Sequence, residues 1–298
     1  MTCTSCMSEP ASTQQMAATS KPTLMTPADL QSLPMQPPDH VLPYGDDVNQ
    51  VGELRIPRQP GPHPVVVLIH GGCWKAEYAT RRDLAPMGDT LRADGVASWN
   101  VEYRRLGQPG GGWPGTYLDV GRAIDHLRTL AATHDLNLGK VVLVGHSAGG
   151  HLAMWAGTRQ RIAQTSALFV PMPLPIKGVI NLAGTIDMTE NIARMEGECR
   201  DAVVSGMLGG TPAAVPDRYR EVSAGTMLPL GVPQVLVWGE HENFVPLALA
   251  QRHAAAASQA GDRAGVIVVP AVGHFETASP ASTAWPTVLG AIRSLLRD

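Results

Sequence analysis

A serine flanked by glycines is the residue whose surroundings point most directly to chemistry. The segment Gly145-His146-Ser147-Ala148-Gly149 has the pattern G-x-S-x-G. It follows the apolar run 141–144 and precedes a stretch that is compatible with a helix. In this strand–turn–helix setting the serine occupies a sharp, strained turn, and the small residues on either side let strand and helix pack closely. We therefore predict that Ser147 is a nucleophile.

Backbone N–H groups must meet the negative charge that develops on an attacked carbonyl oxygen. The segment His70-Gly71-Gly72-Cys73-Trp74 follows the apolar run 65–69, and its glycines leave the amides unshielded by a Cβ. We expect the amides of Gly71, Gly72 and Ala148 to form this oxyanion hole. A plain glycine turn at the end of a strand is the alternative.

Side chains close to these motifs are candidates for contact with the substrate. We expect such contacts from Trp74, His146 and Trp113. Cys73 offers a second nucleophile in principle, but Lys75 is its one basic neighbour and no helix begins there, so little activates its thiol.

A serine hydroxyl becomes a good nucleophile only when a base removes its proton. Among the ten histidines, His274 is the best placed, because it lies in the loop after the last predicted strand and close to the C-terminus. His70 adjoins the glycines, where we expect it to brace the loop. His146 and His151 flank the serine and cannot easily face it. His274 is therefore the candidate base.

An acid must hold the tautomer of the histidine and stabilise its cation. The loop Gly239-Glu240-His241-Glu242-Asn243-Phe244-Val245-Pro246 follows a predicted strand at 234–238. Glu242 is our candidate, and Glu240 and Asp187 are the alternatives. The chain order serine, acid, histidine is then the order that the α/β-hydrolase fold uses.

The elements that must position these residues alternate along the chain from about residue 51. Short β-branched runs alternate with longer helix-compatible stretches, which indicates an α/β fold with a mostly parallel sheet and helices on both faces. Predicted strands span 52–56, 65–69, 96–103, 141–145, 178–182, 234–238 and 265–269, and predicted helices span 81–94, 117–134, 148–159, 247–259 and 284–296. We expect one domain at 41–298, with a short helical insertion at 188–229 over the site, after a tail at 1–40 that is disordered in large part.

The composition of the 298 residues excludes several classes of protein. The net charge is 23 − 26 = −3 with no basic block, which argues against a nucleic-acid surface. No apolar run approaches the roughly 18–20 residues that span a bilayer, so we expect no membrane span. Four cysteines are too few for a disulfide scaffold, and the C-x2-C pair Cys3 and Cys6 has no second pair at zinc-ligand spacing, so we expect no metal. Nucleotide and flavin motifs are missing too, so no cofactor is expected.

The N-terminal residues bear on the cellular location of the protein. About 25 residues there are rich in Thr, Ser, Ala, Met and Gln, and they lack the basic start and apolar core of a secretory signal. We therefore expect a cytoplasmic protein. The sequence leaves its oligomeric state open.

Taken together, these motifs resemble those of the esterase and lipase group of the α/β-hydrolase superfamily. The segment from His70 to Trp74 resembles the H-G-G-x-W signature of kynurenine formamidases and related carboxylesterases, with Cys73 where the hormone-sensitive-lipase group has a third glycine. Residues 145–153 are similar to the G-x-S-A-G-G-H-L-A elbow of both groups. The acid loop matches G-x-x-D-x-x-V-P, with Glu242 where aspartate is usual. The resemblance extends from about residue 48 to the C-terminus and implies the α/β-hydrolase fold.

We expect a serine hydrolase that cleaves carboxylic esters of small, uncharged acyl groups through an acyl-enzyme. The alternative is the same chemistry on another bond: an arylformamidase acting on N-formylkynurenine, or a prolyl-oligopeptidase-like amide hydrolase, which the lack of a large accessory domain disfavours. A non-enzymatic receptor on this scaffold would not need nucleophile, base and oxyanion glycines together. The expected partner is thus a small-molecule ester or amide. Apolar side chains of the insertion either line its pocket or form plain core: Met188, Ile192, Met195, Met207 and Leu208.

Overall fold

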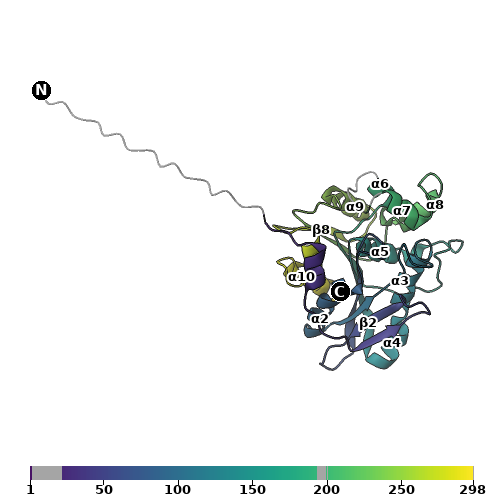
Figure 1. Cartoon of the computed structure of the whole chain (residues 1–298), viewed down its shortest axis with the longest axis horizontal. Coiled ribbons are helices and arrows are strands. Elements are labelled where there is room, and N and C mark those ends of the chain that lie inside the picture. Colours follow the sequence, from purple (N-terminus) through teal and green to yellow (C-terminus); the bar gives the residue numbers. More distant parts are fainter. Residues whose placement is uncertain (2–21, 193–198, 200, 298) are drawn as a thin grey trace.

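An eight-stranded sheet forms the centre of the molecule (Figure 1). The computed structural model describes every residue except 2–21, 193–198, 200 and 298. The strands are β1 (His40–Pro43), β2 (Val51–Arg55), β3 (His63–Ile69), β4 (Ala97–Val101), β5 (Leu136–His146), β6 (Gly178–Leu182), β7 (Gln234–Gly239) and β8 (Ala264–Val269). Their order across the sheet is β1-β2-β4-β3-β5-β6-β7-β8. Strand β2 is antiparallel to β1 and β4, and all other neighbours are parallel, which confirms the mostly parallel sheet.

The parallel strands bring loops that are far apart in sequence to one edge of the sheet. Ile69 at the end of β3 pairs with Gly145 of β5, and Gly239 at the end of β7 pairs with Val269 of β8. Because these residues lie at the carboxyl ends of their strands, the loops that follow begin side by side. These four loops carry the predicted oxyanion glycines, nucleophile, acid and base.

Helices cover both faces of the sheet (Figure 1). They are α1 (Pro27–Ser32), α2 (Ala85–Ala93), α3 (Gly115–Asp125), α4 (Leu127–His134), α5 (Ala148–Gly157), α6 (Met188–Ile192), α7 (Asp201–Leu208), α8 (Pro216–Val222), α9 (Leu247–Gln259) and α10 (Trp285–Arg297). Helices α2 and α10 pack on one face, and α3, α5 and α9 pack on the other. The helices predicted from the sequence are present with two differences. The one at 117–134 is divided into α3 and α4, and the one at 81–94 begins as a 3-10 helix, η1 (Arg81–Leu84), before α2.

The alternation of side chains along β3 assigns each residue to one of the two faces. Val65, Val67 and Ile69 belong to the core beneath α3 and α5, whereas Val66 and Leu68 belong to the core beneath α2 and α10. All five side chains are fully buried. A strand covered on both faces is apolar throughout for this reason.

The segment between residues 22 and 40, which the sequence groups with the N-terminal tail, packs on the domain in part. Thr26 caps α1 by accepting a hydrogen bond from the Asp29 amide, and Asp29 accepts one from the Thr26 amide in return. Leu30 is 1% exposed and joins the core beneath α2 and α10. One buried apolar residue in a six-residue helix makes no periodic pattern, so the sequence did not indicate this contact.

The expectations of no metal site and no membrane span involve residues that the structure does not describe or describes only in part. Cys3 and Cys6 lie outside the described residues, so the prediction of no metal there stays a prediction. Within the described part of the chain, no helix is both long and apolar enough to cross a bilayer. No group of three or more potential metal ligands occurs among those residues either.

Candidate active site

Ser147 lies in the sharp turn between β5 and α5, with φ 53° and ψ −121°. A positive φ is strained for a residue with a side chain, and such strain is common at functional sites. The glycines of the motif make the turn possible. A Cβ on Gly145 would lie 2.0 Å from the Gly149 carbonyl oxygen, and a Cβ on Gly149 would lie 2.0 Å from the Ile69 carbonyl oxygen. The turn holds the Ser147 side chain at the carboxyl edge of the sheet.

The loop after β3 passes directly beside this turn. Three consecutive residues adopt positive φ angles: Gly72 (93°), Cys73 (50°) and Trp74 (55°). A Cβ on Gly71 would lie 3.0 Å from the Ser147 Cβ, so glycine permits the close approach. The described backbone hydrogen bonds include none donated by the amides of Gly71, Gly72 or Ala148. These amides are therefore available to an oxyanion.

His274 and Glu242 form a buried pair at the same edge. His274 Nδ1 lies 2.7 Å from Glu242 Oε2, and the two side chains are 4% and 1% exposed. The other carboxylate oxygen, Oε1, accepts hydrogen bonds from the amides of Phe244 (2.6 Å) and Val245 (2.9 Å). Glu242 is thus fixed by its own loop and holds the imidazole through one ring nitrogen.

The two alternative acids lie elsewhere. Asp187 Oδ1 accepts hydrogen bonds from the amides of Thr189 and Glu190 and so caps the start of α6. Glu240 has a side chain that is 55% exposed, and its Oε2 accepts from the Ala271 amide. The structure therefore brings Glu242, and neither alternative, to His274.

Ser147 and His274 line one cavity of about 340 Å³. Among the described hydrogen bonds, none joins Ser147 Oγ to His274. Catalytic hydrogen bonds are often long without substrate and tighten in the complex, so the lack of this bond does not exclude His274 as the base. Ser147, His274 and the two glycines Gly71 and Gly72 line this one cavity.

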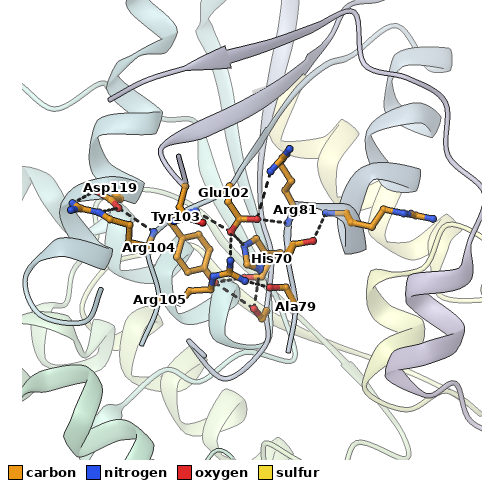
Figure 2. A network of polar contacts seen from close by, with 12 residues as sticks. His70, Ala79, Arg81, Glu102, Tyr103, Arg104, Arg105 and Asp119 are labelled. Carbon is orange, nitrogen blue, oxygen red and sulfur yellow. Dashed lines mark hydrogen bonds and ion pairs between the residues drawn. The ribbon is translucent and has the colours of Figure 1, made fainter. Parts of the chain in front are cut away.

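A buried ionic network contacts the loop after β3, residues 70–74, which we call the oxyanion loop for its predicted role (Figure 2). His70 Nε2 lies 2.8 Å from Glu102 Oε1, and the His70 ring stacks on Tyr103 with 4.5 Å between centroids. The Tyr103 hydroxyl donates to the His70 carbonyl oxygen at 2.7 Å. Arg105 pairs with Glu102 at 3.2 Å and donates to the carbonyl oxygen of Ala79, which lines the cavity. His70 thus supports the oxyanion loop from within this network, as we expected from the sequence.

Glu102 is the centre of this network and is the residue that sequence reasoning missed. Burial alone would raise the pKa of its carboxyl, but His70 and Arg105 outweigh burial and lower that pKa to about 2. The carboxylate also accepts a hydrogen bond from the Arg81 amide. Glu102 falls near the end of the predicted strand at 96–103, and an acidic residue at the carboxyl end of a buried strand lies at that edge of the sheet, which is the signal that could have found it.

The predicted substrate contacts separate into two groups. His146 lines the cavity, and its Nε2 lies 3.2 Å from the His274 carbonyl oxygen. Burial, with the nearby His274, lowers the pKa of His146 well below its usual value, so its ring is neutral. Trp74 and Trp113 are not brought to the cavity. Trp74 is 1% exposed and its ring packs edge-on against His151, while Trp113 lies beneath Arg218.

A disulfide joins the oxyanion loop to the insertion. Cys73 is bonded to Cys199, with 5.1 Å between their Cα atoms, and both residues line the cavity. In this form Cys73 has no free thiol and cannot be the nucleophile. Among the described residues of the predicted insertion, Cys199 is the one that lines the cavity, whereas Met188, Met207 and Leu208 are buried in the core. Met195 and the side chain of Ile192 lie outside the described residues.

Several further residues line the cavity. Pro27, Leu30 and Gln31 of α1 and Tyr78, Ala79 and Asp83 after the oxyanion loop come from segments that the motifs did not indicate, whereas Phe244 and Phe275 lie beside the acid and the base in the predicted loops. Most of these side chains are apolar. Their positions depend on how distant segments pack, which local patterns do not report.

Comparison with known proteins places this site in a family. The model of the BD-FAE family matches residues 54–256, which is more than half of the chain. The chain belongs to the BD-FAE family. Among curated proteins, this BD-FAE member is similar to esterase LipC of Mycobacterium tuberculosis (strain ATCC 25618 / H37Rv), with 25% identity over 240 residues. That match covers 78% of this chain and 58% of LipC, so the chain spans less than two thirds of that relative.

Solved structures show the same fold as this BD-FAE chain. Esterase B from Lactobacillus rhamnosis (HN001) superposes with a TM-score of 0.74 at 20% identity, over 89% of this chain and 88% of that one. A bifunctional GH43-CE protein from Bacteroides eggerthii gives 0.71 at 24% identity, over 85% of this chain and 34% of that one. These likenesses confirm the α/β-hydrolase fold. The match to the BD-FAE family model, together with the similarity to esterase LipC, confirms the resemblance to the esterase and lipase group.

Proposed function

We propose that this protein is a serine hydrolase that cleaves carboxylic esters of small, uncharged acyl groups through an acyl-enzyme. The observation that carries the proposal is the buried hydrogen bond between His274 Nδ1 and Glu242 Oε2, on a cavity that Ser147 also lines. A carboxylate that accepts the Nδ1 proton leaves Nε2 of the ring as the acceptor for a serine proton. The similarity to esterase LipC supports ester bonds as the target.

The reaction runs in two halves. His274 Nε2 takes the Ser147 proton while Oγ attacks the carbonyl carbon, and the C=O electron pair moves onto the oxygen, where the amides of Gly71, Gly72 and Ala148 hold it. The tetrahedral intermediate then collapses, the bond to the alcohol oxygen breaks, and the alcohol leaves with the proton from His274. Water, deprotonated by His274, attacks the acyl-enzyme in the same way and releases the acid and the free serine.

The size and the lining of the cavity support the part of the proposal that concerns small, uncharged acyl groups. Its volume of about 340 Å³ is near the lower end of the range of ligand sites, which run from roughly 300 to 1,000 Å³. The wall of the cavity includes the apolar side chains of Leu30, Phe244 and Phe275. An apolar wall around the reacting carbonyl disfavours a charged acyl group, because that charge would lose its hydration without a partner.

Formamide cleavage is the second candidate. The same nucleophile, base and oxyanion amides would cleave an N-formyl group, and the H-G-G-x-W pattern at His70 to Trp74 favours it. A binding protein without activity is disfavoured, because a buried acid–base pair beside an elbow serine has no evident use in binding alone.

The disulfide between Cys73 and Cys199 bears on the cellular location of the protein. Disulfides persist in oxidising compartments and are rare in the cytosol of most organisms. The cytoplasmic location expected from the sequence stays a prediction, and this bond argues against it.

Hydrolysis assays test the proposal directly. We would measure kcat/KM for p-nitrophenyl acetate, butyrate and dodecanoate beside N-formylkynurenine. The proposal expects the two short esters to exceed the dodecanoate and the formamide by about tenfold or more, because a small apolar pocket discriminates by size. Faster cleavage of N-formylkynurenine would favour the formamidase, and failure to cleave any short ester would contradict the proposal.

A further inference from the structure

One acidic side chain in the cavity has no part in the proposed mechanism. Asp83 lies in the 3-10 helix η1 (Arg81–Leu84), which follows the oxyanion loop, and it is 8% exposed. It lines the same cavity as Ser147 and His274. A carboxylate in a small and mostly apolar substrate cavity needs a partner, because burial of an uncompensated charge is costly.

The protein supplies no direct ion-pair partner for this carboxylate. In the parts of the chain that the structure describes, Asp83 forms no ion pair within 4.0 Å, although Arg82 lies near enough to attract its charge. Arg81 Nε lies 3.0 Å from Glu53, and Arg82 donates to the Leu33 carbonyl oxygen. Burial raises the pKa of the Asp83 carboxyl, an effect that His70, the Thr80 backbone and Arg82 offset only in part.

Two polar residues complete the corner of the cavity around Asp83. Gln31 of α1 donates through Nε2 to the Tyr78 carbonyl oxygen at 2.9 Å, and both residues line the cavity. The Gln31 side chain also interacts with the Asp83 carboxyl and helps to lower its pKa. An ionised carboxylate can only accept hydrogen bonds, so this corner is suited to a ligand group that donates them.

We propose that Asp83 determines specificity by accepting a hydrogen bond from a hydroxyl or a protonated amine on the substrate ester, away from the reacting carbonyl. The inference rests on the proposed ester hydrolysis. A substrate that lacks the donor leaves the buried carboxylate unpaired, and sites built around a buried polar group discriminate strongly against such analogues. The substrate class is therefore a small ester with an apolar body and one donor group.

Pairs of esters of equal size test this inference in the wild-type enzyme. On the alcohol side, protonated 2-(dimethylamino)ethyl acetate is matched with 3-methylbutyl acetate, and 4-hydroxybutyl acetate with pentyl acetate. On the acyl side, methyl 6-hydroxyhexanoate is matched with methyl heptanoate. We expect kcat/KM for at least one donor ester to exceed that of its partner by about tenfold or more. The pair that responds identifies the donor and the side of the ester that carries it.

Variants then assign the preference to Asp83. Asp83→Leu removes the acceptor at similar size, and we expect the ratio of the two kcat/KM values to fall to about one, because the donor ester loses its acceptor and the apolar ester no longer leaves a carboxylate unpaired. A residue that only supported the fold would lower both rates together and leave their ratio unchanged. Glu77→Gln is the matched control, because Glu77 lies on the same loop with a side chain that is 56% exposed. The ratio of the two kcat/KM values in Glu77→Gln should equal the ratio in the wild type.

The outcomes separate this inference from the proposed function. Equal rates within every pair in the wild type overturn the inference without any variant, and so does a preference that survives in Asp83→Leu. If plain esters are cleaved without a donor preference, the inference fails alone. If no ester is cleaved and a fluorophosphonate does not label Ser147, the proposed function fails and the inference fails with it.

Discussion

Glu242 Oε2 lies 2.7 Å from His274 Nδ1 while its Oε1 accepts two backbone amides of its own loop. This arrangement accommodates glutamate at a position where the resemblance suggests aspartate. The side chain is one methylene longer, and its second oxygen is held at 2.6 Å and 2.9 Å by the amides of Phe244 and Val245. The carboxylate is therefore fixed on two sides, which sets the ring orientation of His274.

Removing the charge of Glu242 should cripple the enzyme. We expect Glu242→Gln to lower kcat by about 10³–10⁴, because an amide no longer holds the required tautomer of His274. Glu240→Gln and Asp187→Asn are the controls and should stay within about tenfold of the wild type, since neither residue contacts His274. Steady-state kinetics on a short p-nitrophenyl ester measure all three. If Asp187→Asn were inactive and Glu242→Gln active, the acid that holds His274 would be Asp187, in the loop after β6.

The N-terminal segment should divide into a dispensable part and a part that belongs to the site. Deleting residues 1–21 should leave kcat/KM and Tm nearly unchanged, because the sequence there has no apolar periodicity. Deleting 1–33 removes α1 and with it Leu30, which is 1% exposed, so we expect Tm to fall and kcat/KM to drop about tenfold or more as the cavity opens. Equal behaviour of the two deletions would show that α1 contributes nothing to the site.

Breaking the disulfide should loosen the oxyanion loop. We expect Cys199→Ser to reduce the free energy of unfolding by about 2–4 kcal/mol, because the bond closes a long loop in the unfolded chain. The separation of the two cysteines is 126 residues. Urea unfolding measures the change, with Cys6→Ser as the control. Dithiothreitol should lower the wild type to the level of Cys199→Ser, and a wild type that is insensitive to reductant and equal to the variant would contradict the expectation.

The network under the oxyanion loop should make stability depend on pH at the acid end. Removing one partner of a buried ion pair leaves the others uncompensated, so Glu102→Gln should lower the free energy of unfolding by about 3 kcal/mol at pH 7. The folded pKa of Glu102 is about 2, below its ordinary value of 4.5, so its contribution is complete above pH 4.5 and is lost as pH falls toward 2.

Urea unfolding of the wild type and Glu102→Gln at several pH values measures this difference. The gap between the two proteins should narrow steadily below pH 4.5. Glu77→Gln is a control on an exposed carboxylate and should track the wild type throughout. A gap that stays constant down to pH 3 would show that the charge of Glu102 does not stabilise the loop.

The sequence indicates the sheet and the loops of the site because each depends on a local pattern. The runs at β3, β5, β6 and β7 are apolar, and the elbow around Ser147 has steric requirements that only small residues meet. The parallel order then places the loops after β7 and β8 side by side. Chain order together with the resemblance of the acid loop therefore sufficed to pair Glu242 with His274.

The remaining features of the site depend on packing between distant segments. Leu30 reaches the cavity from a six-residue helix, and Cys73 meets a cysteine 126 residues away. Trp74 was expected at the substrate because it follows the oxyanion glycines, but its positive φ of 55° accompanies a ring that is buried against His151. No periodicity or motif reports such contacts, because they arise only when the chain folds.

Labelling of Ser147 with a fluorophosphonate is the measurement that tests the central claim most directly. Wild-type protein should gain one covalent adduct at Ser147, located by peptide mass spectrometry, and lose its esterase activity in proportion. Ser147→Ala should take up no label and lose nearly all turnover, by several orders of magnitude, with an unchanged fold. Ser166→Ala, which removes a hydroxyl bonded to Glu221, should be labelled like the wild type. A Ser147→Ala protein that is labelled, or that keeps more than about a tenth of the activity, would contradict the account.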